Sequence, residues 1–102
     1  MDSLQKLYQN AKAGFADIRE IIQNDNSIII IPISKDISNY DLYLEPLIEV
    51  GTEIKEYSVL AESDDNTTVS TEHQLIYENG VPTIKICWNE RFKGYIGVTI
   101  KS

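Results

Sequence analysis

A run of isoleucines between residues 27 and 34 restricts the fold of this 102-residue chain more than any other feature. β-branched residues favour strands, and a half-buried strand would alternate apolar with polar side chains. This run does not alternate, because its apolar residues are Ile28, Ile29, Ile30, Ile31 and Ile33. It therefore predicts a strand that is buried on both faces, or a strand with one face masked by a neighbouring subunit. Pro32 predicts that one side of the strand lacks a hydrogen-bonding partner near its end, or that the strand bends there.

The dipeptide Asn79-Gly80 is the clearest turn signal, because these two residue types accept the positive φ angles of a type I′ turn. It predicts a hairpin in which a two-residue turn joins residues 74–78 to residues 81–88. Alternation in the second arm separates an inward set of side chains from an outward set. The inward set is Ile84, Ile86 and Trp88, and the outward set is Thr83, Lys85 and Cys87.

Further alternating segments predict strands at residues 40–44, 53–61 and 95–101, and the polar residues 62–68 predict a mobile surface loop. With the isoleucine run and the hairpin, this gives five or six antiparallel strands. The expected fold class is α+β, mainly β: an N-terminal amphipathic helix followed by a small antiparallel β-sandwich or partly open barrel. The expected core is Ile29, Ile31, Ile84, Ile86, Trp88, Ile96, Val98 and Ile100.

The N-terminal segment carries apolar residues at heptad spacing, namely Leu4, Tyr8, Ala11, Phe15, Ile18 and Ile22. Asp2 or Ser3 can cap a helix there, and Asn24-Asp25-Asn26 can end it. The pattern predicts a helix of about 20 residues and a division into an N-terminal helix, residues 1–24, and an antiparallel β domain, residues 25–102. The apolar stripe either packs on the protein's own sheet or forms an oligomer interface between copies, giving a dimer or trimer.

Acidic side chains dominate the middle of the chain. There are 16 acidic and 9 basic side chains in all, for a net charge of −7. Eleven of the acids lie between Asp36 and Glu78, where Lys55 is the only base. Direct nucleic-acid binding is disfavoured, since it depends on Lys and Arg displacing counterions from phosphates. The acids form either a solvated surface or a decoy that imitates nucleic acid for a basic partner.

No residue pattern indicates a catalytic, metal or cofactor site. His73 is the only histidine and has no second ligand or nucleophile at a recognisable spacing. Cys87 is the only cysteine, so it forms no intramolecular disulfide. Asp64-Asp65-Asn66 lacks the spacing, glycine and terminal glutamate of an EF-hand loop. We expect a non-enzymatic protein with no signal peptide and no membrane-spanning segment.

The order of parts, a heptad helix from Leu4 to Ile22 and then a β domain ending in residues 89–100 (NERFKGYIGVTI), resembles small structural proteins of tailed bacteriophages. Fibre, head-decoration and baseplate proteins share this layout. The resemblance implies a virion component that self-associates through its helix and contacts other structural proteins, in the virion or the host cytoplasm. It carries over no functional residue. The alternatives are a small acidic phage-encoded inhibitor of a host defence or nucleic-acid enzyme, and a bacterial protein-protein adaptor.

Overall fold

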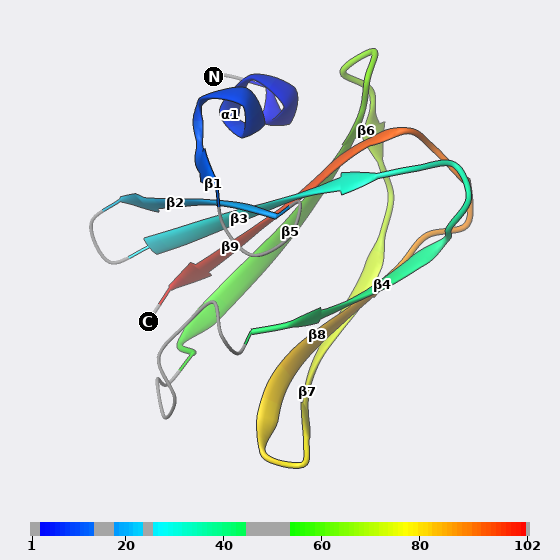
Figure 1. Cartoon of the computed structure of the whole chain (residues 1–102). Helices are drawn as coiled ribbons and strands as arrows, with labels where there is room; N and C mark the ends of the chain where they lie inside the picture. The colour runs from blue at the N-terminus through cyan, green and yellow to red at the C-terminus, as the bar shows by residue number, and fades with distance from the viewer. Residues whose placement is uncertain (1–2, 14–17, 24–25, 45–53, 102) are drawn as a thin grey trace.

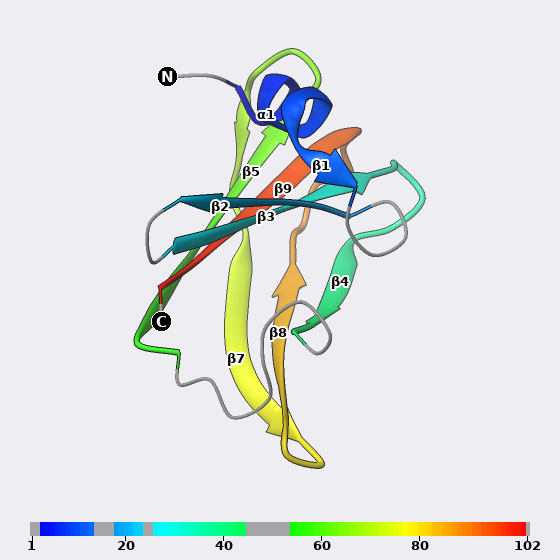
Figure 2. The same cartoon turned by 60° about the vertical axis from the view of Figure 1, so that its left-hand side comes forward.

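Two antiparallel sheets pack face to face in a computed structural model that describes residues 3–13, 18–23, 26–44 and 54–101 (Figures 1 and 2). Sheet A has the strand order β1 (Lys12–Ala13), β2 (Arg19–Gln23), β3 (Asn26–Ile33), β9 (Gly94–Lys101), β5 (Glu56–Ser63) and β6 (Thr68–Val69). Sheet B has the order β4 (Asn39–Tyr43), β8 (Val81–Cys87) and β7 (Glu72–Glu78). The mainly β fold class is confirmed, as a sandwich that does not close into a barrel.

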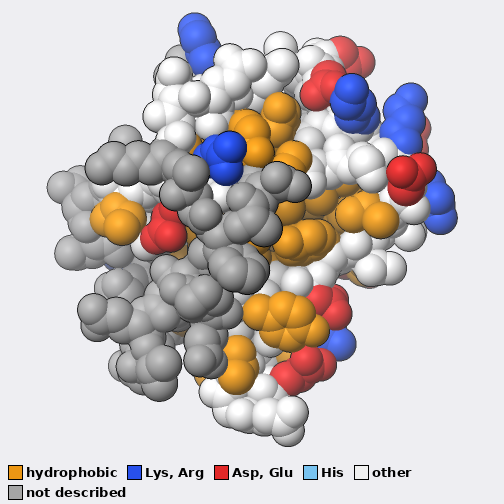
Figure 3. Space-filling view, viewed as in Figure 1, with side chains coloured by type: hydrophobic (Ala, Val, Ile, Leu, Met, Phe, Trp, Pro, Cys, Tyr) orange, Lys and Arg blue, Asp and Glu red, His pale blue; other side chains and the backbone are white. Residues whose placement is uncertain are grey.

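The core lies between the two sheets, and all eight residues predicted for it are buried. Sheet A contributes alternate residues of β3 and β9, such as Ile29, Ile31 and Val98, together with Ala61 of β5. Sheet B contributes the inward residues of β4 and β8. Hydrophobic side chains gather between the sheets in Figure 3, while charged side chains lie around them. The alternation in these strands therefore identified the inward faces correctly.

The isoleucine run forms β3, and the predicted burial on both faces is confirmed at the centre of the strand, while Ile28 and Pro32 on the outer face are half-buried. One face enters the core, and on the other face Ile30 is 0% exposed. Ile30 pairs with Gly97 of β9, and Leu4 of the N-terminal helix contacts Gly97 there. Pro32 pairs with Tyr95 of β9, and the described part of β2 pairs with β3 as far as Ile30; the residues that would lie opposite Pro32 on the other side are outside the described chain, so the prediction for Pro32 stays a prediction.

The N-terminal helix is much shorter than predicted. Helix α1 spans Leu4–Asn10, with the Ser3 hydroxyl accepting a hydrogen bond from the Lys6 N–H at 3.3 Å. The prediction that helix continues to Ile22 and fills residues 1–24 is wrong, because Arg19–Gln23 is a strand paired with β3 along its length. Sheet pairing and the β-branched side chains of this segment outweigh the heptad spacing. The described residues contain no helix that is long and apolar enough to cross a membrane.

The predicted hairpin is confirmed in detail. Asn79 and Gly80 have φ angles of 52° and 81°, and Glu78 pairs with Val81 on either side of them. Ile84 and Ile86 are buried, and Cys87 is exposed on the opposite face. Thr83 lies on that opposite face but is fully buried, with its hydroxyl donating to the Val81 carbonyl oxygen at 3.3 Å.

Candidate functional site

The heptad residues do not form one helical stripe. Leu4 is 5% exposed and packs against sheet A, whereas Ile18 is 7% exposed and lies in the core between the sheets. Tyr8 contacts the ring of Tyr95 and the guanidinium of Arg19, at 4.9 and 5.0 Å. Ala11 is half-buried, Ile22 is 72% exposed, and Phe15 lies outside the described residues. These residues therefore do not lie on one helix, and an oligomer interface formed by them stays a prediction.

His73 and Cys87 do not converge. The His73 Nδ1 atom lies 3.0 Å from the Tyr57 hydroxyl of β5, so the His73 side chain faces sheet A. This contact joins β7 of sheet B to β5 of sheet A. Cys87 is exposed, and the register pairs it with Glu72, so its side chain points to the outer face of sheet B. Neighbouring strands thus direct the two groups to opposite faces. Among the described residues, no three His, Cys, Asp or Glu side chains gather as metal ligands would.

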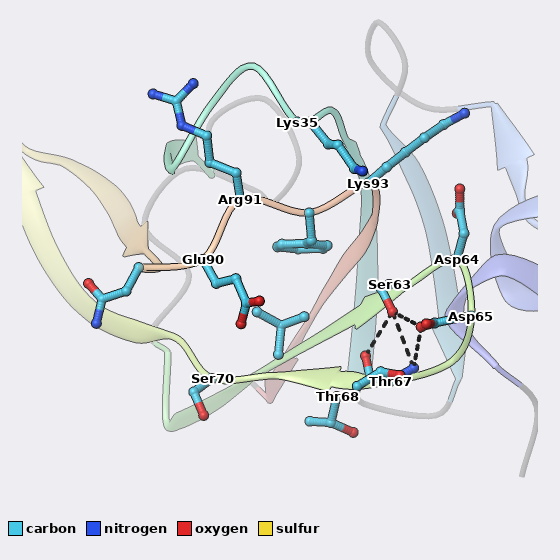
Figure 4. A pocket seen from close by; sticks show the side chains of 13 residues that line it. Lys35, Ser63, Asp64, Asp65, Thr67, Thr68, Ser70, Glu90, Arg91 and Lys93 are labelled. Atoms are coloured by element: carbon cyan, nitrogen blue, oxygen red, sulfur yellow. Dashed lines mark hydrogen bonds between the residues drawn. The ribbon is translucent and has the colours of Figure 1, made fainter.

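A hollow of about 690 Å³ lies at one end of the sandwich, between the turn after β5 and the connection from β8 to β9 (Figure 4). Its lining carries both signs of charge. Three of its residues are cations (Lys35, Arg91 and Lys93) and three are carboxylates (Asp64, Asp65 and Glu90). This balance selects neither anions nor cations, so the hollow is a poor candidate for a charged small-molecule site.

The turn beside this hollow, predicted as a mobile loop, is organised by hydrogen bonds. The Asp65 carboxylate accepts from the Ser63 hydroxyl and from the Thr67 N–H, and these bonds lower the pKa of Asp65. The Asp64 N–H donates to the Lys93 carbonyl oxygen at 2.9 Å, which joins the turn to the β8–β9 connection. Because protein donors satisfy the Asp65 carboxylate, the pair Asp64-Asp65 is explained as a turn motif.

The outer face of sheet B is acidic. A shallow groove of about 370 Å³ crosses it, lined by Asn39, Asp41, Glu72, His73, Gln74, Lys85, Ile86 and Cys87. The face carries Asp41, Glu72 and Glu78, and Lys85 is its one cation among the described residues. Lys85 Nζ lies 3.3 Å from Glu78 Oε1, and Glu78 and then Asp41 raise the pKa of Lys85. Helix α1 packs on the outer face of sheet A. On the outer face of sheet B, Thr83 is fully buried, and the exposed part of the face carries Asp41, Glu72, Lys85 and Cys87.

Strand β7 is a long edge. Within the described chain, sheet A ends in two-residue strands, β1 and β6, and β6 covers only Ala61 and Glu62 of β5, so residues 56–60 also lie at an edge. Strand β7 has seven residues, and within the described chain it pairs only with β8. The residues that flank a two-residue hairpin turn bond each other, so Glu78 and every second residue before it bond β8. The N–H and C=O groups of His73, Leu75 and Tyr77 therefore point away from the sheet.

Two observations agree with the outward direction of the backbone groups of His73, Leu75 and Tyr77. Pro82, the partner of Tyr77, directs its carbonyl oxygen away from β7 and accepts from the Leu44 N–H at 3.1 Å. No hydrogen bond found among the described residues uses a backbone group of His73, Leu75 or Tyr77 outside the strand ladder. Sequence reasoning found the hairpin but missed its position in the sheet, since no local signal tells which arm lies at an edge.

We also compared the chain with protein-family models, curated protein sequences and solved structures, and none of these comparisons gave a match. The functional reasoning below therefore depends on the geometry of the chain itself.

Proposed function

We propose that this chain is a non-enzymatic protein-interaction module that holds a partner protein through sheet B. The observation that carries the proposal is the seven-residue edge of β7, which pairs only with β8 among the described residues, beside the exposed acidic part of the sheet B face. Exposed strand edges are sites of pairing with other chains, and proteins usually shorten, cover or bend them. Sheet A of the described chain also leaves residues 56–60 of β5 without a partner on the β6 side, so what distinguishes the β7 edge is its position beside the acidic face.

The acidic face points to the charge of the partner. Asp41, Glu72 and Glu78 outnumber Lys85, and Lys85 already pairs with Glu78. A complementary partner presents Lys or Arg, which speeds association and makes it sensitive to salt. A component of a phage virion or an adaptor would use such a surface to contact another assembly protein. The acidic face also favours a second candidate function, an inhibitor that occupies a basic surface of a nucleic-acid enzyme.

A displayed library of protein fragments tests the proposal. The wild-type chain, immobilised, should retain fragments that a Glu72→Lys/Glu78→Lys variant does not retain. The matched control is Asp36→Lys/Asp64→Lys, which makes the same charge change at exposed residues outside sheet B and should retain the fragments. The proposal is wrong when no fragment is retained by the wild type, or when all three proteins retain the same fragments equally. Inhibition of a nuclease by the wild type, lost in the sheet B variant, would single out the inhibitor function.

A further inference from the structure

We infer that the partner contributes an extended segment that adds to β7 as a fourth strand of sheet B, with Lys or Arg opposite Glu72 and opposite Glu78. This inference rests on the proposed function and makes its binding mode and partner class specific. It requires free backbone groups along the edge, a charge pattern that selects a basic strand, and side-chain positions that a strand of defined sequence can match. Among the described residues, the structure supplies all three.

The backbone of β7 offers a regular ladder. His73, Leu75 and Tyr77 each direct one N–H and one C=O outward, at every second residue. The strand contains no proline and no glycine, so nothing interrupts the six groups. Pro82, which could not donate within a central ladder, sits in β8 at a position that does not bond β7. A partner strand of about seven residues can therefore pair along the whole edge.

The charges at the two ends of β7 select against a second copy of the chain. Two β7 strands paired antiparallel over their full length would place Glu72 opposite Glu78 at both ends. Like charges directly opposite in a sheet are destabilising. A segment with cations at these two positions would instead place one cation beside Glu72 and one beside Glu78, which already pairs with Lys85. The edge thus disfavours full-length self-pairing and favours a basic strand.

The positions between the carboxylates complete the pattern. Leu75 lies midway between Glu72 and Glu78, and its half-buried side chain packs against the core between the sheets. An apolar residue opposite Leu75 would extend that contact on the inner side. The partner segment therefore has seven residues: a basic residue at its first and seventh positions, opposite Glu72 and Glu78, and an apolar residue at its fourth position, opposite Leu75. The pattern is symmetric, so it is the same for a parallel and an antiparallel strand.

A synthetic peptide of this pattern, with the core Lys-Thr-Thr-Val-Thr-Thr-Lys, tests the inference on the full chain. Its binding is measured by fluorescence anisotropy, and its position by amide chemical shifts in NMR spectra. Binding should shift the amide signals of His73, Leu75 and Tyr77, and it should weaken as salt rises. Glu72→Gln/Glu78→Gln should weaken it about tenfold, because it removes two exposed ion pairs. Circular dichroism checks that this variant keeps its fold.

Two control peptides separate strand addition from charge attraction. A peptide with N-methyl groups on the backbone edge that faces β7 has the same charge but cannot form the ladder, and it should bind about tenfold more weakly. A peptide of the same composition with both lysines at one end should also bind more weakly. Equal binding of the N-methylated peptide, or no binding of the parent peptide, overturns the inference. The fragment-library result is independent of these peptides, so either outcome leaves the proposed function to be judged separately.

Discussion

Leu4 lies directly over Gly97, so closely that a Cβ atom on residue 97 would lie 2.7 Å from the Leu4 Cδ2 atom. The absence of a side chain on β9 is what allows α1 to rest on sheet A. Glu62 of β5 holds the same end of the helix, because its Oε1 atom accepts a hydrogen bond from the Leu4 N–H at 2.8 Å. A carboxylate at this position also interacts favourably with the helix dipole.

Gly97→Ala should lower the free energy of unfolding by about 1–3 kcal/mol, because the new methyl group collides with Leu4. In a Leu4→Ala background the same change should cost less, since the shorter side chain leaves room. Urea denaturation of the wild type, both single variants and the double variant measures this coupling. Additive effects would show that the contact does not hold the helix.

Truncation of the core should be costly. Ile86→Ala or Ile96→Ala should each lower the free energy of unfolding by about 2–5 kcal/mol, because both side chains are buried between the sheets. The control is Ile22→Ala, which trims an exposed isoleucine and should change the stability by less than about 0.5 kcal/mol. Thermal or urea denaturation gives the comparison. Equal effects at the three sites would contradict the assignment of the inward faces.

Much of the fold could be predicted from the sequence because its signals are local. The isoleucine run, Asn79-Gly80 and the alternation in β8 and β9 each depend on neighbouring residues. The segment that includes Ile18 and Ile22 contains strand β2 and not the predicted helix. A spacing of four residues places two side chains on the same side of a helix and also on the same side of a strand, so the spacing alone does not distinguish them. Only pairing with β3, a contact made by the folded chain, decides between them. The open edge of β7 was missed for the same reason, since strand order is set by contacts distant in sequence.

Ile18 distinguishes packing within the chain from packing between chains. Ile18→Asp should lower the free energy of unfolding by about 3 kcal/mol or more, because it places an unpaired charge in the core. Light scattering before melting should show no change in molecular mass. The matched substitution Ile22→Asp, at an exposed side chain, should leave the melting temperature nearly unchanged. A fall in mass for Ile18→Asp without a loss of fold would restore the oligomer hypothesis.

Glu20 should make stability depend on pH. It lies on the inner side of β2, opposite Ile29, and burial raises the pKa of its carboxyl above the usual value of 4.5. The folded state therefore favours the protonated form. Stability from this group is fully present below the usual pKa, and it is lost as the pH rises through the raised pKa. Glu20→Gln should accordingly raise the melting temperature at pH 7.

The gain from Glu20→Gln should disappear as the pH falls below about 4, where the wild-type carboxyl is protonated in both states. Glu90→Gln, the same substitution at an exposed residue, is the control for the chemical change itself. Melting curves recorded from pH 3 to pH 8 compare the two variants with the wild type. If the melting temperature of Glu20→Gln stays above that of the wild type at low pH, the cause is packing of the new amide and not the raised pKa of Glu20.

The central place of β9 in sheet A has a consequence for biosynthesis. Residues 94–101 fill the gap between β3 and β5, so the ribosome must produce nearly all of the described chain before those strands can join. Until then, the isoleucine run of β3 has an unpaired side and no complete core to cover it. Such non-local pairing slows folding and leaves apolar segments open to aggregation. Folding of this sandwich should therefore wait until β9 has been synthesised, and nascent chains that end before residue 94 should be clients of chaperones.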